Sequence, residues 1–112
     1  MHVGDLDDNS NNQSGANWNA RVRITVHDSN HGGVANATVT AMVTFDTTSV
    51  SISCIADITG QCQLVQQVSD TFGSATVTIT NVTNAGFSYD ATFNHDPDGD
   101  SDGATIIVIR PP

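Results

Sequence analysis

The sequence predicts an all-β protein, an antiparallel two-sheet β-sandwich of immunoglobulin-like type with about seven strands. Two observations support this prediction. Thr, Val and Ser dominate the composition and suit pleated strands, whereas Glu and Lys, which favour helices, are absent. Apolar and polar residues alternate with a period of two over short segments, and clusters of Gly, Asn, Asp and Ser separate these segments. A closed barrel is the alternative architecture.

Seven segments carry this alternation or a comparable apolar run. The clearest is 19–28, in which Ala20, Val22, Ile24 and Val26 share one face of an extended chain. Each segment is short and is followed by turn residues, as in a sandwich of hairpins. The predicted strands lie in the ranges 19–28, 34–45, 50–54, 62–68, 75–80, 87–93 and 104–110.

Three segments depart from simple alternation. Adjacent Leu64 and Val65 break the period, which indicates a bulge or a strand that changes sheets. The segment 104–110 is apolar on both faces, which is typical of a central strand. Near the start, Val3 and Leu6 are expected to lie along a sheet edge.

Length and charge limit the classes of function. A chain of 112 residues is expected to form one domain, residues 1–112. Its formal net charge of −9, from twelve Asp and three Arg, argues against binding to nucleic acid and to anionic membranes. No run approaches the ~20 apolar residues that span a bilayer, and the start lacks the features of a signal peptide. If the protein is secreted, we expect the chain to be cut from a longer precursor.

The most biased stretch is Asn94–Gly103, NHDPDGDSDG. From Asp98 it follows the pattern D-x-D-x-D-G, which matches the first six positions of a calcium loop of EF-hand type. The twelfth position, which should hold a bidentate Glu, is Ile109. The loop therefore predicts a calcium site that needs ligands from elsewhere in the chain. The carboxylates of this stretch are Asp96, Asp98, Asp100 and Asp102.

The N-terminal segment offers the missing ligands. Asp5 and Asp7 lie on the same side of an extended chain, and the two ends of a compact domain are often close together. We therefore predict a Ca²⁺ clasp between this segment and the acidic loop. The alternatives are a solvated acidic turn and a transition-metal site that includes His2 and His95.

Cys54 and Cys62 are separated by a spacing that suits a disulfide stapling a hairpin. A disulfide implies an oxidising compartment. The alternative is a pair of buried free thiols.

Catalysis has little support in the sequence, because no nucleophile elbow is present and the Asp cluster resembles a cation site more than an acid–base pair. The protein is therefore not expected to be an enzyme. Carbohydrate binding is the main rival function, but Trp18 is expected to cap the core and Phe45, Phe87 and Phe93 fall on inward positions.

The opening MHVGDLD and the later NHDPDGDSDG resemble the paired signature of a bacterial immunoglobulin-like domain found at the C-terminal ends of secreted proteins, including subtilisin-like peptidases. The middle of the chain, GGVANATVTA followed by DITGQC, is similar to invasin-type repeats and carboxypeptidase regulatory-like domains. The pattern departs at Asp8, where Gly commonly follows GDLD. The resemblance implies a non-catalytic accessory module.

These observations predict a secreted, calcium-stabilised and disulfide-stapled accessory or spacer domain of a bacterial multidomain protein. Its expected partner is a covalently linked catalytic or adhesive domain. The alternative function is a carbohydrate- or surface-binding module of an extracellular hydrolase, with a cell-surface or polysaccharide ligand. A hydrolase is the weakest of the three hypotheses.

Overall fold

The computed structural model describes residues 1–12, 16–30, 32–90, 94 and 104–110. Over these residues the chain forms β-strands and turns, and no helix that could cross a membrane is found among them. The strands are β1 His2–Asp8, β2 Asn11–Asn12, β3 Asn17–His27, β4 Thr38–Phe45, β5 Thr48–Ile55, β6 Gln61–Ser69, β7 Ser74–Thr83 and β8 Thr105–Ile109.

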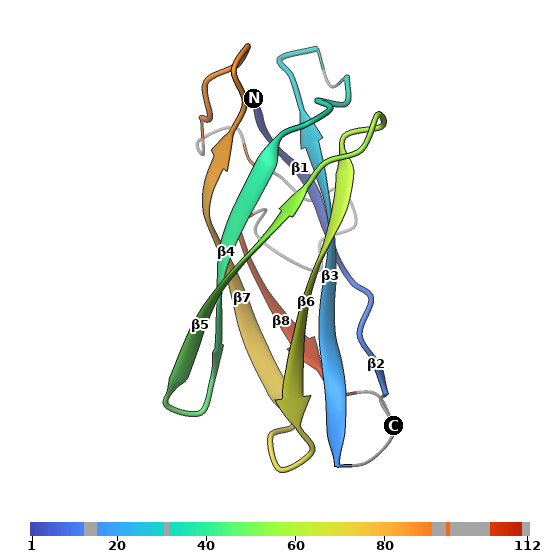
Figure 1. Ribbon diagram of the computed structural model, residues 1–112, viewed down its shortest axis with the longest axis vertical. Coiled ribbons are helices and arrows are strands. Elements are labelled where there is room, and N and C mark those ends of the chain that lie inside the picture. Colours follow the sequence, from blue (N-terminus) through green and yellow to red (C-terminus); the bar gives the residue numbers. More distant parts are fainter. Residues whose placement is uncertain (13–15, 31, 91–93, 95–103, 111–112) are drawn as a thin grey trace.

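The strands form two antiparallel sheets that pack face to face (Figure 1). In the first sheet, β1 and β2 pair with one side of β3 and β6 pairs with the other side. The second sheet has the order β5-β4-β7-β8. If β2 is set aside, these orders correspond to A-B-E and C′-C-F-G, which is an immunoglobulin-like arrangement. The predicted two-sheet antiparallel sandwich is confirmed.

The core lies between the sheets and uses the predicted alternation. On β3, the apolar side chains from Ala20 to Val26 are at most 2 % exposed, and on β4 Val39, Ala41 and Val43 are fully buried. Trp18 is also fully buried, and its Nε1 donates a hydrogen bond to the carbonyl of Phe72 over 3.0 Å. Trp18 therefore belongs to the core, as expected, because its one polar atom has a partner there.

A β-bulge occurs in β1 rather than in β6. The pairing of β1 with β3 shifts register between Val3 and Asp5, so that Val3 and Leu6, which are an odd number of residues apart, both face the core. β6 keeps an unbroken register with β3, and Val65 simply points outward. The expectation of a bulge in β6 was wrong, because an isolated apolar residue on the outer face resembles a change of period. The strand does lie in the opposite sheet from β5.

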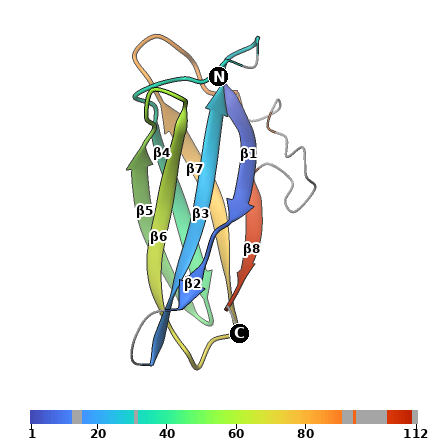
Figure 2. The same cartoon turned by 90° about the vertical axis from the view of Figure 1, so that its right-hand side faces the viewer.

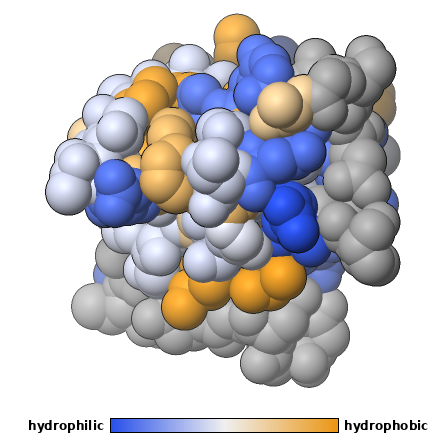
Figure 3. Space-filling view, turned by 90° about the horizontal axis from the view of Figure 1, so that it is seen from below, coloured by the Kyte–Doolittle hydropathy of each residue, from blue (hydrophilic) through white to orange (hydrophobic). Residues whose placement is uncertain are grey.

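Two further strand predictions were wrong, the central position of 104–110 and the strand character of the described residues 87–90. β8 is an edge strand, with Ile107 and Ile109 62 % and 58 % exposed, because its outward face is left uncovered. Apolar side chains also reach the surface at the lower end of the molecule (Figure 3). Within the expected strand at 87–93, Phe87 is 46 % exposed and forms only an isolated bridge with Asn84. Ala91 and Phe93 lie outside the described residues.

Candidate metal site at the edge of β1

The predicted metal ligands divide into two groups. Asp5 and Asp7 lie on β1, where the structure describes them. The other four predicted ligands lie outside the described residues, and so does His95 of the alternative site. These four are Asp96, Asp98, Asp100 and Asp102.

Asp5 and Asp7 flank the fully buried Leu6, so alternation along β1 turns their side chains away from the core. Both residues are half-buried, and the Oδ1 atom of Asp5 is fully enclosed. The carboxylate of Asp7 lies 3.5 Å from the Nη2 atom of Arg23 on β3, in a pair that is partly open to solvent. Two carboxylates thus lie on one face at the margin of the first sheet.

The edge of β1 that faces away from β3 is bordered by the segment that leads into the acidic stretch. The N-terminal amine of Met1 donates to the carbonyl of Ser88 over 2.6 Å, and the backbone N–H of Asp90 donates to the carbonyl of Met1 over 2.8 Å. The backbone N–H of Val3 donates to Oδ1 of Asn94 over 2.7 Å. Asn94, the first residue of the acidic stretch, is therefore held beside β1. Its bonding partner Val3 lies two residues before Asp5 along this strand.

Two further contacts fix Asn94 and the far end of the stretch. Asn94 Nδ2 donates to the hydroxyl of Tyr89 over 2.7 Å, so the amide is held from both sides. After the stretch, the carbonyl of Ala104 accepts a 2.7 Å hydrogen bond from the backbone of Ile79 on β7.

The last strand then runs beside the first. The backbone N–H of Ile109 on β8 donates to Oδ2 of Asp8 over 3.3 Å, which joins the ends of β8 and β1 across the two sheets (Figure 2). Both ends of the acidic stretch thus lie on the same margin of the sandwich as β1. Sequence reasoning did not assign roles to Asp8 and Asn94, because neither an edge-capping carboxylate nor an anchoring amide has a periodic signature.

A pair of histidines occupies the start of β1. His2 is 5 % exposed and is the register partner of His27, and their rings meet edge to face with centroids 5.8 Å apart. The ring of His27 lies directly over Gly4, where a Cβ atom would come within 2.0 Å of Nδ1. Gly4 is therefore needed for close approach, and His2 is part of this packed cluster.

Two other aspartates have local structural roles. Oδ1 of Asp57 accepts hydrogen bonds from the N–H and hydroxyl of Thr59 and from the N–H of Gln61, and the Thr59 hydroxyl bond in particular lowers the pKa of Asp57. Asp28 similarly accepts from the backbone N–H groups of Gly32 and Asn30, and these bonds lower its pKa. These aspartates serve turn chemistry, which accounts for part of the acid excess without a metal.

The described residues do not by themselves form a complete metal site. In the described ranges, no three His, Cys or Asp side chains lie close enough together to hold an ion. Asp5 and Asp7 supply only oxygen atoms, which suit Ca²⁺ better than a soft transition metal, but Ca²⁺ takes six to eight such ligands. A site here would therefore need the four aspartates outside the described residues.

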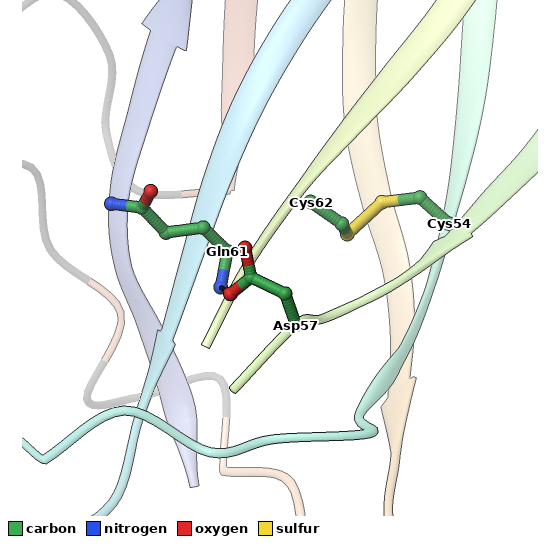
Figure 4. The surroundings of a disulfide bond; sticks show 4 residues. All are labelled: Cys54, Asp57, Gln61 and Cys62. Carbon is green, nitrogen blue, oxygen red and sulfur yellow. Dashed lines mark hydrogen bonds between the residues drawn. A yellow bond between two sulfur atoms is a disulfide. The ribbon is translucent and has the colours of Figure 1, made fainter. Parts of the chain in front are cut away.

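A disulfide joins Cys54 and Cys62, with Cα atoms 5.9 Å apart, beside the turn that Asp57 and Gln61 close (Figure 4). The prediction of the disulfide is confirmed, but its description as a hairpin staple was wrong. Cys54 is on β5 of the second sheet and Cys62 is on β6 of the first, so the bond ties the two sheets together. Sequence spacing alone cannot distinguish a hairpin from a crossover between sheets.

Two kinds of surface feature of the described residues bear on the rival functions, namely pockets and exposed aromatic side chains. No pocket is hollowed into the part of the molecule formed by the described residues. Among the aromatic side chains considered for sugar stacking, Trp18 is buried and Tyr89 is partly buried and bonded to Asn94, whereas Phe87, which was expected to face inward, is 46 % exposed.

A scan against protein-family models, a search of curated proteins and a search of solved structures each found no match to this chain.

Proposed function

We propose that this chain is a non-catalytic accessory domain of a secreted bacterial multidomain protein and that Ca²⁺ stabilises its fold. The resemblance of the two end motifs to bacterial immunoglobulin-like domains supports this context. The disulfide agrees with an oxidising compartment. The partner is then a catalytic or adhesive domain in the same polypeptide.

One observation carries the proposal. The acidic stretch is anchored beside β1 at Asn94, and it leads into β8, whose end is bonded to Asp8 of β1. These two contacts hold the described ends of the stretch at the margin where Asp5 and Asp7 lie, which supports a clasp between the two acidic segments. Ca²⁺ would be held by Asp5, Asp7, Asp96, Asp98, Asp100 and Asp102.

The ion would contribute stability for a simple reason. Four aspartates within seven residues repel one another, and a divalent cation removes this repulsion. Because the ligands come from the two ends of the chain, the unfolded chain does not present them together. Binding only to the folded state stabilises it by about 2.7 kcal/mol when free Ca²⁺ is a hundredfold above Kd.

The first test is thermal unfolding with EDTA and with excess Ca²⁺, together with a calorimetric titration. A stabilisation of this size should raise the unfolding midpoint by about 10 °C in a domain of this length. An unchanged midpoint, with no heat of binding, would exclude the calcium site.

The second test separates the clasp from a loop that binds metal alone. Asp5→Asn with Asp7→Asn should weaken Ca²⁺ binding about as much as two such changes within the acidic stretch. Asp46→Asn with Asp70→Asn is the matched control, because it removes the same charge at two turns, one after β4 and one after β6, neither of which pairs with β1. If affinity survives the change on β1, the loop binds Ca²⁺ without a clasp.

A further inference from the structure

The four edges of the two sheets are protected unequally. The edge of β1 is bordered by Asn94, which accepts a hydrogen bond from Val3. On β8, the N–H of Ile109 is capped by Asp8. On β6, the side chain of Gln66 donates to the carbonyl of Gln67 over 3.0 Å. Natural sheets block their edges with such devices, because an open edge pairs readily with another strand.

The edge of β5 has no such protection in the described part of the chain. A two-residue turn joins β4 to β5, so Phe45 and Thr48 form the first hydrogen-bonded pair of the hairpin. Alternate residues of β5 then direct their N–H and C=O groups away from β4. The next pair, Thr44 and Ser49, should then be a non-hydrogen-bonded pair, in which the two side chains are closest. The 3.2 Å distance between their hydroxyl oxygens agrees with this assignment. The residues with outward-directed backbone groups are Ser49, Ser51, Ser53 and Ile55.

The composition of β5 also favours pairing. The strand is TSVSISCI, with no charge and no proline, and its register with β4 has no bulge. Its inward side chains Val50, Ile52 and Cys54 are only half-buried, whereas Val39 and Val43 of the neighbouring β4 are fully buried. An added strand would bury the inward row and satisfy the open backbone groups.

We propose that β5 pairs with β5 of a second copy of this chain, in antiparallel register about a two-fold axis. The two four-stranded sheets then become one continuous sheet. The register that uses all the open groups sets Ile52 opposite Ile52 of the second copy and Ser51 opposite Ser53. It forms about eight hydrogen bonds, two for each bonded pair.

The composition of the strand points to a second copy as the occupant. β5 supplies three serines and Ile55 for the outer row and apolar side chains for the inner row, so it is complementary to itself. In a chain of net charge −9, an uncharged strand is where two copies meet with the least local repulsion. The remaining repulsion acts at longer range and is screened at physiological ionic strength, where the Debye length is about 8 Å. Association should therefore strengthen as salt rises.

The test is sedimentation velocity over a range of protein and salt concentrations, at constant Ca²⁺. The wild type should form dimers, and more of them at higher salt. Ser51→Pro should weaken dimerisation at least tenfold, because it removes an outward N–H while leaving the bonds to β4 intact. Ser51→Thr, which keeps the N–H, is the matched control and should dimerise like the wild type.

Hydrogen exchange on the wild type gives a second readout that needs no variant. The amides of Ser49, Ser51, Ser53 and Ile55 should exchange rapidly in dilute protein and become protected as dimers form. A wild type that stays monomeric, equal dimerisation of the proline variant, or protection at another strand would each overturn the proposal. So would open-ended assemblies, or protection of β5 only when a different peptide is added.

Discussion

Single residues decide the local geometry of this sandwich at two kinds of position. Aspartate carboxylates accept the hydrogen bonds that close turns, and Gly4 leaves room for the ring of His27. Asp57 is the clearest carboxylate, because one oxygen accepts three hydrogen bonds at the turn beside the disulfide. Such bonds favour the ionised form, which is why the pKa of Asp57 is lowered.

Asp57→Ala should destabilise the protein in a manner that depends on pH. Because the pKa is lower in the folded state, the stabilisation is fully present above the ordinary carboxyl pKa of about 3.9 and is lost as pH falls through the folded value. Urea unfolding of wild type and variant at pH 7 and below pH 3 checks this. The gap in unfolding free energy should be widest at pH 7, and a gap that stayed constant at low pH would contradict the role of the charge.

Gly4→Ala should lower the unfolding free energy by about 1–3 kcal/mol, the usual cost of overpacking. The added methyl group would collide with the ring of His27, which is itself packed against His2. Gly73→Ala is the matched control, since a Cβ there has no neighbour within 4 Å, and it should be neutral or slightly stabilising. Denaturant unfolding of both variants makes the comparison, and equal stabilities would show that His27 moves aside without cost.

At the scale of elements, sequence reasoning succeeded where one face of a strand is fully buried. β3 and β4 alternate cleanly, and so does β7 as far as Ile79, because each is covered by the opposite sheet. Beyond Ile79 the register of β7 with β4 shifts, so that Ile79 and Val82 are both buried. Sequence reasoning placed Val3 and Leu6 along a sheet edge, where β1 lies, but it missed the bulge at Gly4 that turns both side chains inward. It failed for β8, whose outward isoleucines resemble those of a central strand.

The candidate site was predicted only in part. Asp5 and Asp7 were found because their carboxylates are typical Ca²⁺ ligands, whereas nothing in the sequence indicated that the Asn94 side chain bonds to β1. Such non-local contacts have no signal in a single sequence.

The disulfide is the element-scale device that holds β5 against the opposite sheet. Replacing both cysteines by serine should cost about 2.5 kcal/mol, from the closure entropy of so short a ring. Urea unfolding checks this, and the wild type under a strong reductant should behave like the double variant. Near-UV and far-UV spectra of the native state should change little, because the pairing of β6 with β3 and of β5 with β4 does not depend on the bond. Loss of the native spectra would mean that the bond defines the fold rather than stabilising it.

At the scale of the whole molecule, the sandwich has two open margins, and each is closed differently. At one margin the disulfide joins β5 to β6, and at the other β1 and β8 meet through Asp8. The proposed Ca²⁺ clasp belongs to the second margin. In each sheet at least one strand lies between the two margins, so with strands about 4.8 Å apart they are separated by about 10 Å or more.

This separation makes a prediction about the two devices together. Interactions more than 7–10 Å apart with no shared partners usually contribute independently, within about 0.5 kcal/mol. The increase in unfolding free energy on adding Ca²⁺ should therefore be the same in the wild type and in the variant that lacks both cysteines. Urea unfolding with Ca²⁺ and with EDTA, on both proteins, supplies the four values needed. If Ca²⁺ raised the unfolding free energy only of the disulfide-bonded protein, the two margins would be coupled. The ion would then stabilise the packing of one sheet on the other rather than the edge of β1.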